Sequence, residues 1–312
     1  MSVFSATKHR EKKPPEHEPI HQIRTRGQKI FSVINYIILG ALALICVLPF
    51  WYIVCLSFSS NGAVMSGQVK LLPVDFTLEA YIYVLERDAF WQSMLVTVER
   101  IILGLPINML LIILSAYPLS KPSVKFHGRG VYVWYFFLTM LINGGMIPTY
   151  LVVAQLNLLN TIWALVLPSA INVFNMLLVL SFFRQLPTEI EEAAFVDGAG
   201  HWRILWQLYV PMSMPVLATV ILFTLVQHWN SWFDGLIYMK TENYPLQTYM
   251  RGVIANFDFS KMTPEEQARL AKMNVRTVKS SQMVIGAIPI LAVYPFLQKY
   301  FVSGITLGSV KG

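Results

Sequence analysis

Carboxylates gather in one short stretch of an otherwise apolar chain, the segment LPTEIEEAAFVDGAGHWRILWQLYVPMSMP at residues 186–215. Thr188 and Glu191 have the spacing of a capping box, and acidic residues in a first turn favour a helix start. Gly198 stands where such a helix would end. Paired carboxylates beside small side chains suit a charged, closely packed contact with another protein, and the candidate residues are Glu191, Glu192, Ala193, Ala194, Asp197 and Gly198.

A helix that merely rests on the bilayer surface is the alternative for this stretch. Such helices usually carry basic residues on their polar face. The helix here is acidic, so anionic headgroups would repel it, and a protein partner is the better interpretation.

Catalytic and metal-binding groups are not evident elsewhere. The two cysteines, Cys46 and Cys55, lie nine residues apart in one apolar run, and the six histidines are scattered singly. Neither pattern has the spacing of a metal site or a disulfide. Glu99, Arg100 and His228 are the ionisable residues of the apolar segments; the first two are expected to pair or to snorkel, and the three form no catalytic set. The sequence therefore predicts a chain that is not an enzyme.

Amide and indole side chains within the apolar segments are the candidates for contact with a transported solute. Amides form hydrogen bonds and aromatic rings stack, and both interactions suit a sugar. Asn172 and Asn175 are three apart and are expected to share one helix face. The same residue types also serve helix packing and interfacial aromatic belts, and that alternative stays open. The candidates are Asn143, Asn172, Asn175, Trp229 and Asn230.

Composition indicates the class of protein that positions these residues. Of 312 residues, 55% are hydrophobic and only 13% are charged, about half the charged fraction of a soluble domain. The net charge of +7 does not come from one interleaved aromatic and basic face, so nucleic acid is not an expected partner. The chain is predicted to be an integral membrane protein.

Six crossings follow from the apolar runs, since about 20 apolar residues span a bilayer. Residues 130–183 contain no charge and are too long for one crossing, and the polar stretch AQLNLLNT at 154–161 divides them. The motif Asn143-Gly144-Gly145 is expected to break the third crossing. The predicted crossings are residues 34–57, 101–120 (beginning upstream near Trp91), 130–153, 162–183, 204–233 and 280–298.

Basic residues set the orientation, because cytoplasmic loops carry an excess of Lys and Arg. The tail at residues 1–29 holds seven Lys or Arg against three Glu, and Lys121, Lys125 and Arg129 follow the second crossing. Both termini and the loop 186–211 are thus predicted to be cytoplasmic. The loop 235–279 would then be outside although it holds seven Lys or Arg. A surface helix is expected at 263–274, with contact to an external protein as its functional interpretation.

A longer pattern that includes the acidic stretch resembles the motif of a known protein family. The tripeptide EAA at residues 192–194, the glycine at 198 and LYVP at residues 208–211 closely resemble the EAA motif of ATP-binding-cassette importer permeases. That motif has Ile and Leu where this chain has Leu and Val before the proline. The resemblance implies an all-α membrane protein with six transmembrane helices and a cytoplasmic coupling helix pair between helices four and five.

The resemblance also implies how the work is divided between subunits. The EAA helix would sit in a cleft of a separate ATPase subunit, with Glu192 making a charged contact. Ala193 and Ala194 would allow close packing, and Gly198 would permit the turn between the two short helices. This sequence contains no GxxxxGK[ST] phosphate loop, so ATP and Mg would be bound by the partner, and no cofactor is expected on this chain.

Two further segments resemble the carbohydrate-uptake branch of that family. They are Trp229-Asn230-Ser231-Trp232 and the terminal residues 294–312, which are similar to those of the smaller maltose-system permease and of permeases for complex oligosaccharides. The implied partners are a second homologous permease, two ATPase subunits, an extracytoplasmic solute-binding protein, the lipid bilayer and an oligosaccharide substrate.

The resulting prediction is a multi-pass permease of a bacterial cytoplasmic membrane, with a basic tail at 1–29 and a permease domain at 30–312. It would translocate oligosaccharides or polysaccharide fragments. The alternatives are a permease for peptides or other solutes, an ATP-independent channel and a membrane-embedded enzyme. The sequence names neither the sugar, nor its length, nor the partner subunits, nor whether the cell has one membrane or two.

Overall fold

The computed structural model describes residues 25–255 and 274–309, and in these ranges the chain forms helices and no strand. The expected helix at 263–274 and the basic tail up to residue 24 lie outside the described residues. The helices are α1 (Arg26–Ser57), α2 (Asn61–Met65), α3 (Glu79–Leu85), α4 (Asp88–Ser120), α5 (Arg129–Leu141), α6 (Met146–Gln155), α7 (Ile162–Val166), η1 (Leu167–Ser169), α8 (Val173–Phe183), α9 (Thr188–Val196), α10 (His201–Ile204), η2 (Leu205–Tyr209), α11 (Val210–Met212), α12 (Met214–Asn230), α13 (Phe233–Tyr238), η3 (Thr241–Asn243), α14 (Leu246–Ala255) and α16 (Val275–Ser309).

The chain divides into two compact units, residues 1–50 and 51–312. The described part of the first unit is the beginning of α1, from Arg26 to Phe50. The end of this helix belongs to the second unit, where Trp51 donates from its indole nitrogen to the Leu71 carbonyl at 2.7 Å.

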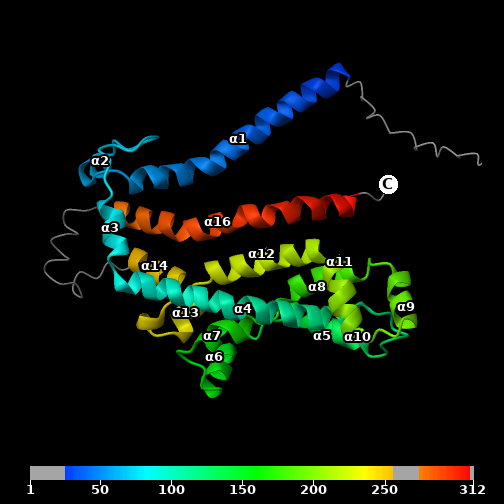
Figure 1. Cartoon of the computed structure of the whole chain (residues 1–312). Coiled ribbons are helices and arrows are strands. Elements are labelled where there is room, and N and C mark those ends of the chain that lie inside the picture. Colours follow the sequence, from blue (N-terminus) through cyan, green and yellow to red (C-terminus); the bar gives the residue numbers. More distant parts are fainter. Residues whose placement is uncertain (1–24, 256–273, 310–312) are drawn as a thin grey trace, which may run out of the picture. The chain divides into compact units, whose positions relative to one another are not determined.

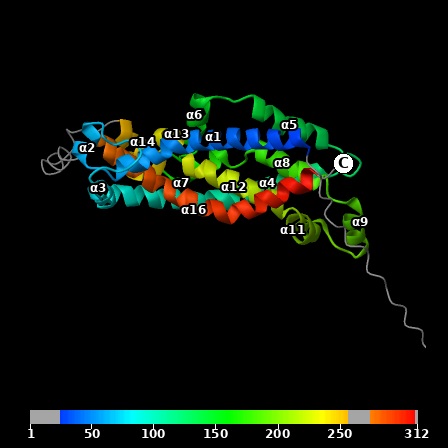
Figure 2. The ribbon, with the colours of Figure 1, turned by 90° about the horizontal axis from the view of Figure 1, so that it is seen from above.

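The second unit is built around α4, which packs against α8 and α12, while α12 also packs against α16. Figures 1 and 2 show α9 at one end of this unit and α3 with α14 at the opposite end. Arg184 after α8 donates to the Leu119 carbonyl near the end of α4 at 3.3 Å, so α4 and α8 end at the same side. Glu191 contacts Lys121 after the end of α4, and the Leu246 N–H donates to Thr97 in its first half, so the segments 186–211 and 233–255 lie toward opposite ends of α4.

Two helices of the described residues, α1 and α4, are each long and apolar enough to cross a membrane. Up to five crossings result if each bent helix pair forms one crossing. The predicted second crossing is α4, which begins at Asp88, close to the predicted start near Trp91. The predicted sixth crossing, 280–298, lies within α16, but α16 is not among those five, so the count of six remains a prediction.

Three of the predicted crossings are bent. The predicted break at Asn143 is confirmed: α5 and α6 meet at 112°, and Gly145 adopts a φ of +90°. The polar stretch 154–161 is also a break, since α6 ends at Gln155 and α7 begins at Ile162. The fourth crossing bends by 49° between η1 and α8.

The fifth crossing, predicted at residues 204–233, is divided into two helical segments. The helical segment His201–Met212 meets α12 at 82°. Proline has no N–H, so Pro211 and Pro215 each remove one bond from the helical ladder on either side of Ser213. The chain turns at that weakened point.

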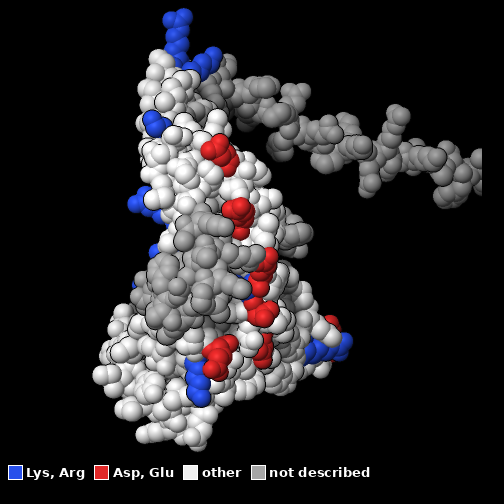
Figure 3. All heavy atoms as spheres, turned by 90° about the vertical axis from the view of Figure 1, so that its left-hand side faces the viewer, with Lys and Arg blue, Asp and Glu red and all other residues white. Residues whose placement is uncertain are grey.

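Charged side chains gather at both ends of the second unit. Figure 3 shows acidic side chains in a row on the end where α3 and α14 lie. The exposed acids of residues 75–88 belong to that end: Asp75, Glu79, Glu86 and Asp88. The end that carries α9 holds the basic residues Lys121, Lys125, Arg129, Arg184 and Arg203, together with the acids Glu189, Glu191, Glu192 and Asp197.

Candidate functional site

The helix α9 is the first of the predicted pair, but its start is not capped as predicted. Pro187 occupies the N-cap position, no side chain caps the helix, and Thr188 lies inside it. The capping-box prediction is therefore wrong. The Glu191 carboxylate that would have reached back to the helix start is instead held inside the chain by Lys121 and a tyrosine hydroxyl.

Glu191 is the centre of a buried cluster. Its Oε2 accepts a hydrogen bond from Lys121 Nζ at 2.8 Å and one from the Tyr209 hydroxyl at 2.5 Å. Its Oε1 lies 3.7 Å from Lys125 Nζ. The Lys121 ammonium also lies 4.0 Å from the ring centroids of both Tyr117 and Tyr209. Glu191 is 4% exposed and Lys121 is 6% exposed, so this ion pair is shielded from water.

The surroundings keep Glu191 ionised. Burial acts to raise the pKa of its carboxyl, but the hydrogen bonds from Lys121 and Tyr209 and the two lysine charges outweigh burial and lower that pKa. Burial lowers the pKa of the Lys121 ammonium, and its contact with Glu191 opposes the shift. Removal of either partner would leave a buried, unpaired charge, which costs about 3–5 kcal/mol.

The end of α9 is formed as the sequence predicts. Gly198 adopts a φ of +78°, a conformation that glycine enters at low cost. Its N–H donates to the Phe195 carbonyl at 3.0 Å, and the Ala199 N–H donates to the Ala194 carbonyl at 2.9 Å. This pair of bonds is a Schellman motif. It sets the direction in which the chain leaves α9 for α10.

The predicted contact residues are divided between two sides of α9. Glu191 points inward, and Ala194 is half-buried against the core formed by α4, α8 and α12. Glu192, Ala193 and Asp197 are exposed. Beside them is a pocket of about 200 Å³ lined by Ala194, Asp197, Ala199, Arg203, Ile204, Gln207 and Leu208. The surface available to a partner thus combines carboxylates, one arginine and small apolar side chains.

The predicted pathway asparagines differ in their surroundings. Asn172 and Asn175 do not share a helix face, because Asn172 precedes α8 and caps it, accepting from the Asn175 N–H at 3.1 Å. Asn175 is 2% exposed and its amide donates to the Thr224 hydroxyl at 3.4 Å. Asn172 is half-buried and donates to Gln227 Oε1 at 3.2 Å. Asn143 is exposed and accepts from the Gly145 N–H at 2.8 Å, which stabilises the break before α6.

Trp229 and Asn230 also differ in burial, although they are adjacent in the sequence. Trp229 is 4% exposed, and its indole nitrogen donates to the Gly286 carbonyl of α16 at 3.1 Å. Its ring is therefore a packing element between α12 and α16. Asn230 is the last residue of α12 and is exposed. Of these two candidates, Asn230 is the one whose side chain reaches the surface.

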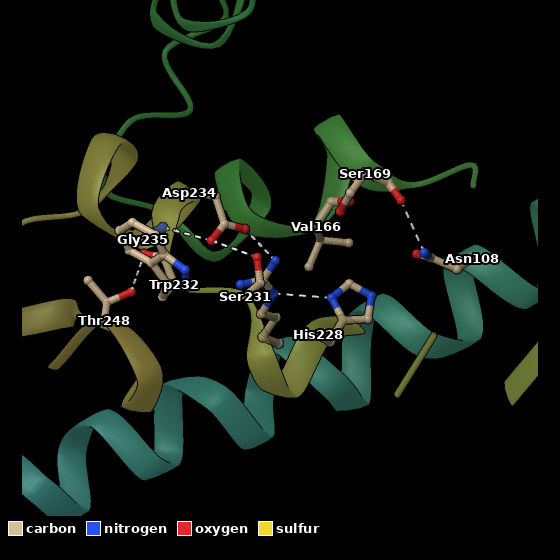
Figure 4. A network of polar contacts seen from close by, with 10 residues as sticks. Asn108, Val166, Ser169, His228, Ser231, Trp232, Asp234, Gly235 and Thr248 are labelled. Atoms are coloured by element: carbon tan, nitrogen blue, oxygen red, sulfur yellow. Dashed lines mark hydrogen bonds and ion pairs between the residues drawn. The ribbon is translucent and has the colours of Figure 1, made fainter. Parts of the chain in front are cut away.

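A buried ionic network at the opposite end of α4 was missed by sequence reasoning (Figure 4). Arg100 is 1% exposed; its Nε donates to His228 Nδ1 at 3.1 Å, and its Nη2 pairs with the Asp234 carboxylate. Asp234 Oδ1 also accepts from the Ser231 hydroxyl at 3.0 Å and from the Gly235 N–H at 2.8 Å. The expectation that Arg100 pairs with Glu99 or snorkels is wrong. Water is scarce at this depth, so the guanidinium needs a buried carboxylate.

Spacing along α4 is the signal that could have found this network. Arg100, Gly104 and Asn108 follow each other at four-residue intervals and so share one helix face. Gly104 makes room for a neighbour, since a Cβ there would lie 2.7 Å from His228 Nε2. Asn108 donates to the Ser169 carbonyl at 3.1 Å. The partners lie far away in sequence, so the spacing reveals a polar face but not what covers it.

Metal or redox chemistry finds no donor set in the part of the chain that the structure describes, where no group of three His, Cys, Asp or Glu side chains could hold a metal ion. Arg100, His228 and Asp234 are in contact, but each is engaged in binding the others. These contacts hold helices together and fix the position of α9 against α4.

The sequence is similar to a known protein family and to individual transport proteins. Residues 84–307 match the family described as "Binding-protein-dependent transport system inner membrane component". The chain is 40% identical to Protein LplC of Bacillus subtilis (strain 168), with 92% of this chain and 97% of LplC covered. It is 37% identical to the polygalacturonan/rhamnogalacturonan transport system permease protein YtcP of the same organism, with 91% and 99% covered.

A solved structure is also similar. It is a bacterial ABC transporter involved in the import of the acidic polysaccharide alginate, and one of its chains is 35% identical to this one. The two superimpose with a TM-score of 0.82 over 89% of this chain and 99% of that chain.

Proposed function

Because the chain belongs to the family of binding-protein-dependent transport system inner membrane components, we propose that it is the permease subunit of an ATP-driven importer of oligosaccharides or polysaccharide fragments. The observation that carries this proposal is the likeness to the alginate importer, with 35% identity and nearly complete coverage of that chain. YtcP, whose printed name gives polygalacturonan and rhamnogalacturonan, supports an acidic polysaccharide fragment as the first substrate to test.

The chain would cross the membrane six times, as α1, α4, α5–α6, α7–α8, α10–α12 and α16. In the second unit the loops between successive segments alternate between the α9 end and the α3 end (Figure 1). The basic residues in the loops at the α9 end favour the cytoplasm for that end. Both termini would then be cytoplasmic, and the acidic row at residues 75–88 would face outward.

The α9 segment would be the surface that an ATPase subunit binds. Glu192, Ala193 and Asp197 are exposed on one short helix, and the pocket beside them includes Arg203. Glu192 would make the charged contact, and the alanine would let the partner approach closely. ATP and Mg would be bound by two ATPase subunits, and this chain would perform no covalent chemistry.

A second, homologous permease would complete the pathway. The helix α5 has no buried residue and exposes large apolar side chains along its length, so it needs lipid or another helix to cover it. A solute-binding protein would deliver the oligosaccharide to the end that carries α3 and α14. Asn172 with Gln227, and Asn230, would be the amides nearest the path, while Asn175 and Trp229 would support the helices around them.

The test is reconstitution of the chain with the second permease, the ATPase and the binding protein of the same cell. ATP hydrolysis and uptake would be measured with binding protein loaded with oligogalacturonate, a neutral oligosaccharide or a peptide. We expect at least a fivefold rise in hydrolysis with an oligosaccharide, together with uptake. The control is an ATPase variant that cannot hydrolyse ATP. Stimulation by the peptide alone, or uptake with that variant, would overturn the proposal in favour of another solute or a channel.

A further inference from the structure

Two buried ion pairs connect α4 to different elements outside the main helices, one directly after its last residue and one at Arg100, in its first half. At one end Lys121, which directly follows α4, pairs with Glu191 of α9 at 2.8 Å. Toward the other end Arg100 pairs with Asp234 of α13. Because an α-helix rises 1.5 Å per residue, these two basic residues are about 30 Å apart along the axis. That distance matches the hydrocarbon thickness of a bilayer.

The pair at the α9 end fixes the position of α9 relative to α4. Two donors, Lys121 and Tyr209, converge on one carboxylate oxygen of Glu191. The Lys121 ammonium is enclosed by the rings of Tyr117 and Tyr209. A shift of α9 by even a few ångströms would leave a carboxylate and an ammonium buried and unpaired, so α9 and the end of α4 must move together.

The opposite end of α4 holds the segment after α12 in a similar way. The Asp234 carboxylate, bound to Arg100, also accepts from Ser231 and from the Gly235 N–H. The Thr97 hydroxyl, one turn before Arg100, accepts from the Leu246 N–H at 2.8 Å. The short helix η3 packs on α4 as well. The segment 231–246 is thus attached to α4 rather than free to move by itself.

Between the two pairs α4 is one unbroken helix, although it contains Pro106 and Pro118. Its packing against α8 and α12 supports it along this length. We propose that α4 is the element that carries a displacement of α9 to the segment 231–246 across the membrane. Glu191, Lys121, Arg100 and Asp234 are its positioning residues. The inference rests on the proposed function, since it assumes that α9 is moved by an ATPase.

In this mechanism Glu191 and Glu192 have different tasks. Glu192 is exposed and meets the partner, whereas Glu191 is buried and transfers the movement to α4. Both residues belong to the same short helix, so a displacement of Glu192 with α9 also displaces Glu191. Of the two adjacent glutamates, one therefore contacts α4 and the other contacts the partner.

The experiment uses the assembled complex in nanodiscs, with Cys46→Ser to remove the exposed thiol and Thr241→Cys as a reporter on η3. The rate of maleimide labelling at position 241 is measured with and without ATP, and the change is divided by the rate of ATP hydrolysis. The variants are Glu191→Gln, Tyr209→Phe, and the exchanged pair Lys121→Glu with Glu191→Lys.

We expect Glu191→Gln to reduce the labelling change per ATP hydrolysed at least fivefold, with a smaller loss for Tyr209→Phe. The exchanged pair should recover part of the change, because opposite charges again face each other although Lys125 then lies beside a second lysine. A full labelling change per ATP in Glu191→Gln would overturn the inference while leaving the proposed function intact. If the parent complex hydrolysed ATP without any labelling change, α4 would not be the link. If no ATPase associated with the parent chain, the proposed function and this inference would both fail.

Discussion

Gly198 offers the sharpest test of how α9 is presented. Its φ of +78° lies in the left-handed region, where an L-residue costs about 1–2 kcal/mol. No atom lies within 4 Å of a Cβ built at this position, so Gly198→Ala adds conformational strain without a clash. A change of 1–2 kcal/mol corresponds to about a 5–30-fold increase in the population with a frayed α9 end. We expect transport per ATP hydrolysed to fall at least twofold, and the loss reaches that range only where the frayed end becomes the major population.

Two matched variants isolate the backbone as the cause. Asparagine tolerates the left-handed region better than alanine does, so Gly198→Asn should keep most of the activity. Gly200 has an ordinary φ of −79° and also has no atom within 4 Å of a built Cβ. Gly200→Ala should therefore reduce transport per ATP less than twofold.

The assay is uptake of labelled oligosaccharide by proteoliposomes, with ATP hydrolysis measured in the same sample. The amount of inserted chain is measured separately and should be equal for all four proteins. The reasoning would be refuted if Gly198→Ala transported normally. It would also be refuted if Gly198→Asn were as impaired as the alanine variant, because strain would then not explain the loss.

Three other predictions concern the carboxylates and amides. Because Glu192 is exposed, Glu192→Ala should insert normally but retain at least fivefold less ATPase on purification; equal retention would contradict its role. Asn175→Ala should destabilise the chain by about 1–3 kcal/mol, since it removes a buried hydrogen-bonding amide. Only Asn172→Ala should change which oligosaccharides stimulate hydrolysis, and a selectivity change in Asn175→Ala would count against this division. Folding lowers the pKa of the Glu191 carboxyl below its ordinary value of 4.5. The ionised carboxylate therefore stabilises the folded chain at pH values above 4.5, and this stabilisation is lost as the pH falls through the lower pKa of the folded state. The melting temperatures of the parent and Glu191→Gln should thus differ between pH 5 and 8 and converge in stronger acid.

Several features of the fold were predictable from local patterns. The apolar runs predicted α1 and α4, the glycines after Asn143 predicted the break before α6, and Gly198 predicted the end of α9. Each depends on residues close together in the chain. The size of the bend in the fifth crossing could not be predicted from Pro211 and Pro215 alone, because the consequence of two missing hydrogen bonds around Ser213 depends on what packs against the bend.

The candidate site was predicted less completely. The acidic stretch was identified, but its carboxylates were treated as one surface, whereas Glu191 faces inward and Glu192 faces outward. A helix turn places adjacent residues about 100° apart, and sequence alone does not say which direction is the interior. Asn172 and Asn175 were predicted to share a helix face because both were expected within one helix. Asn172 is instead the N-cap of α8 and lies outside the helix.

The sequence by itself predicted a membrane permease and an ATPase partner, because composition and the EAA spacing are properties of the chain read in order. The tertiary structure decided which charges are joined. Arg100 forms an ion pair with Asp234, and Lys121 forms one with Glu191, although the partners are far apart in the sequence. Such pairings depend on how the helices pack. A buried charge without a partner is costly in an apolar interior, so the stable packing is one that brings opposite charges together.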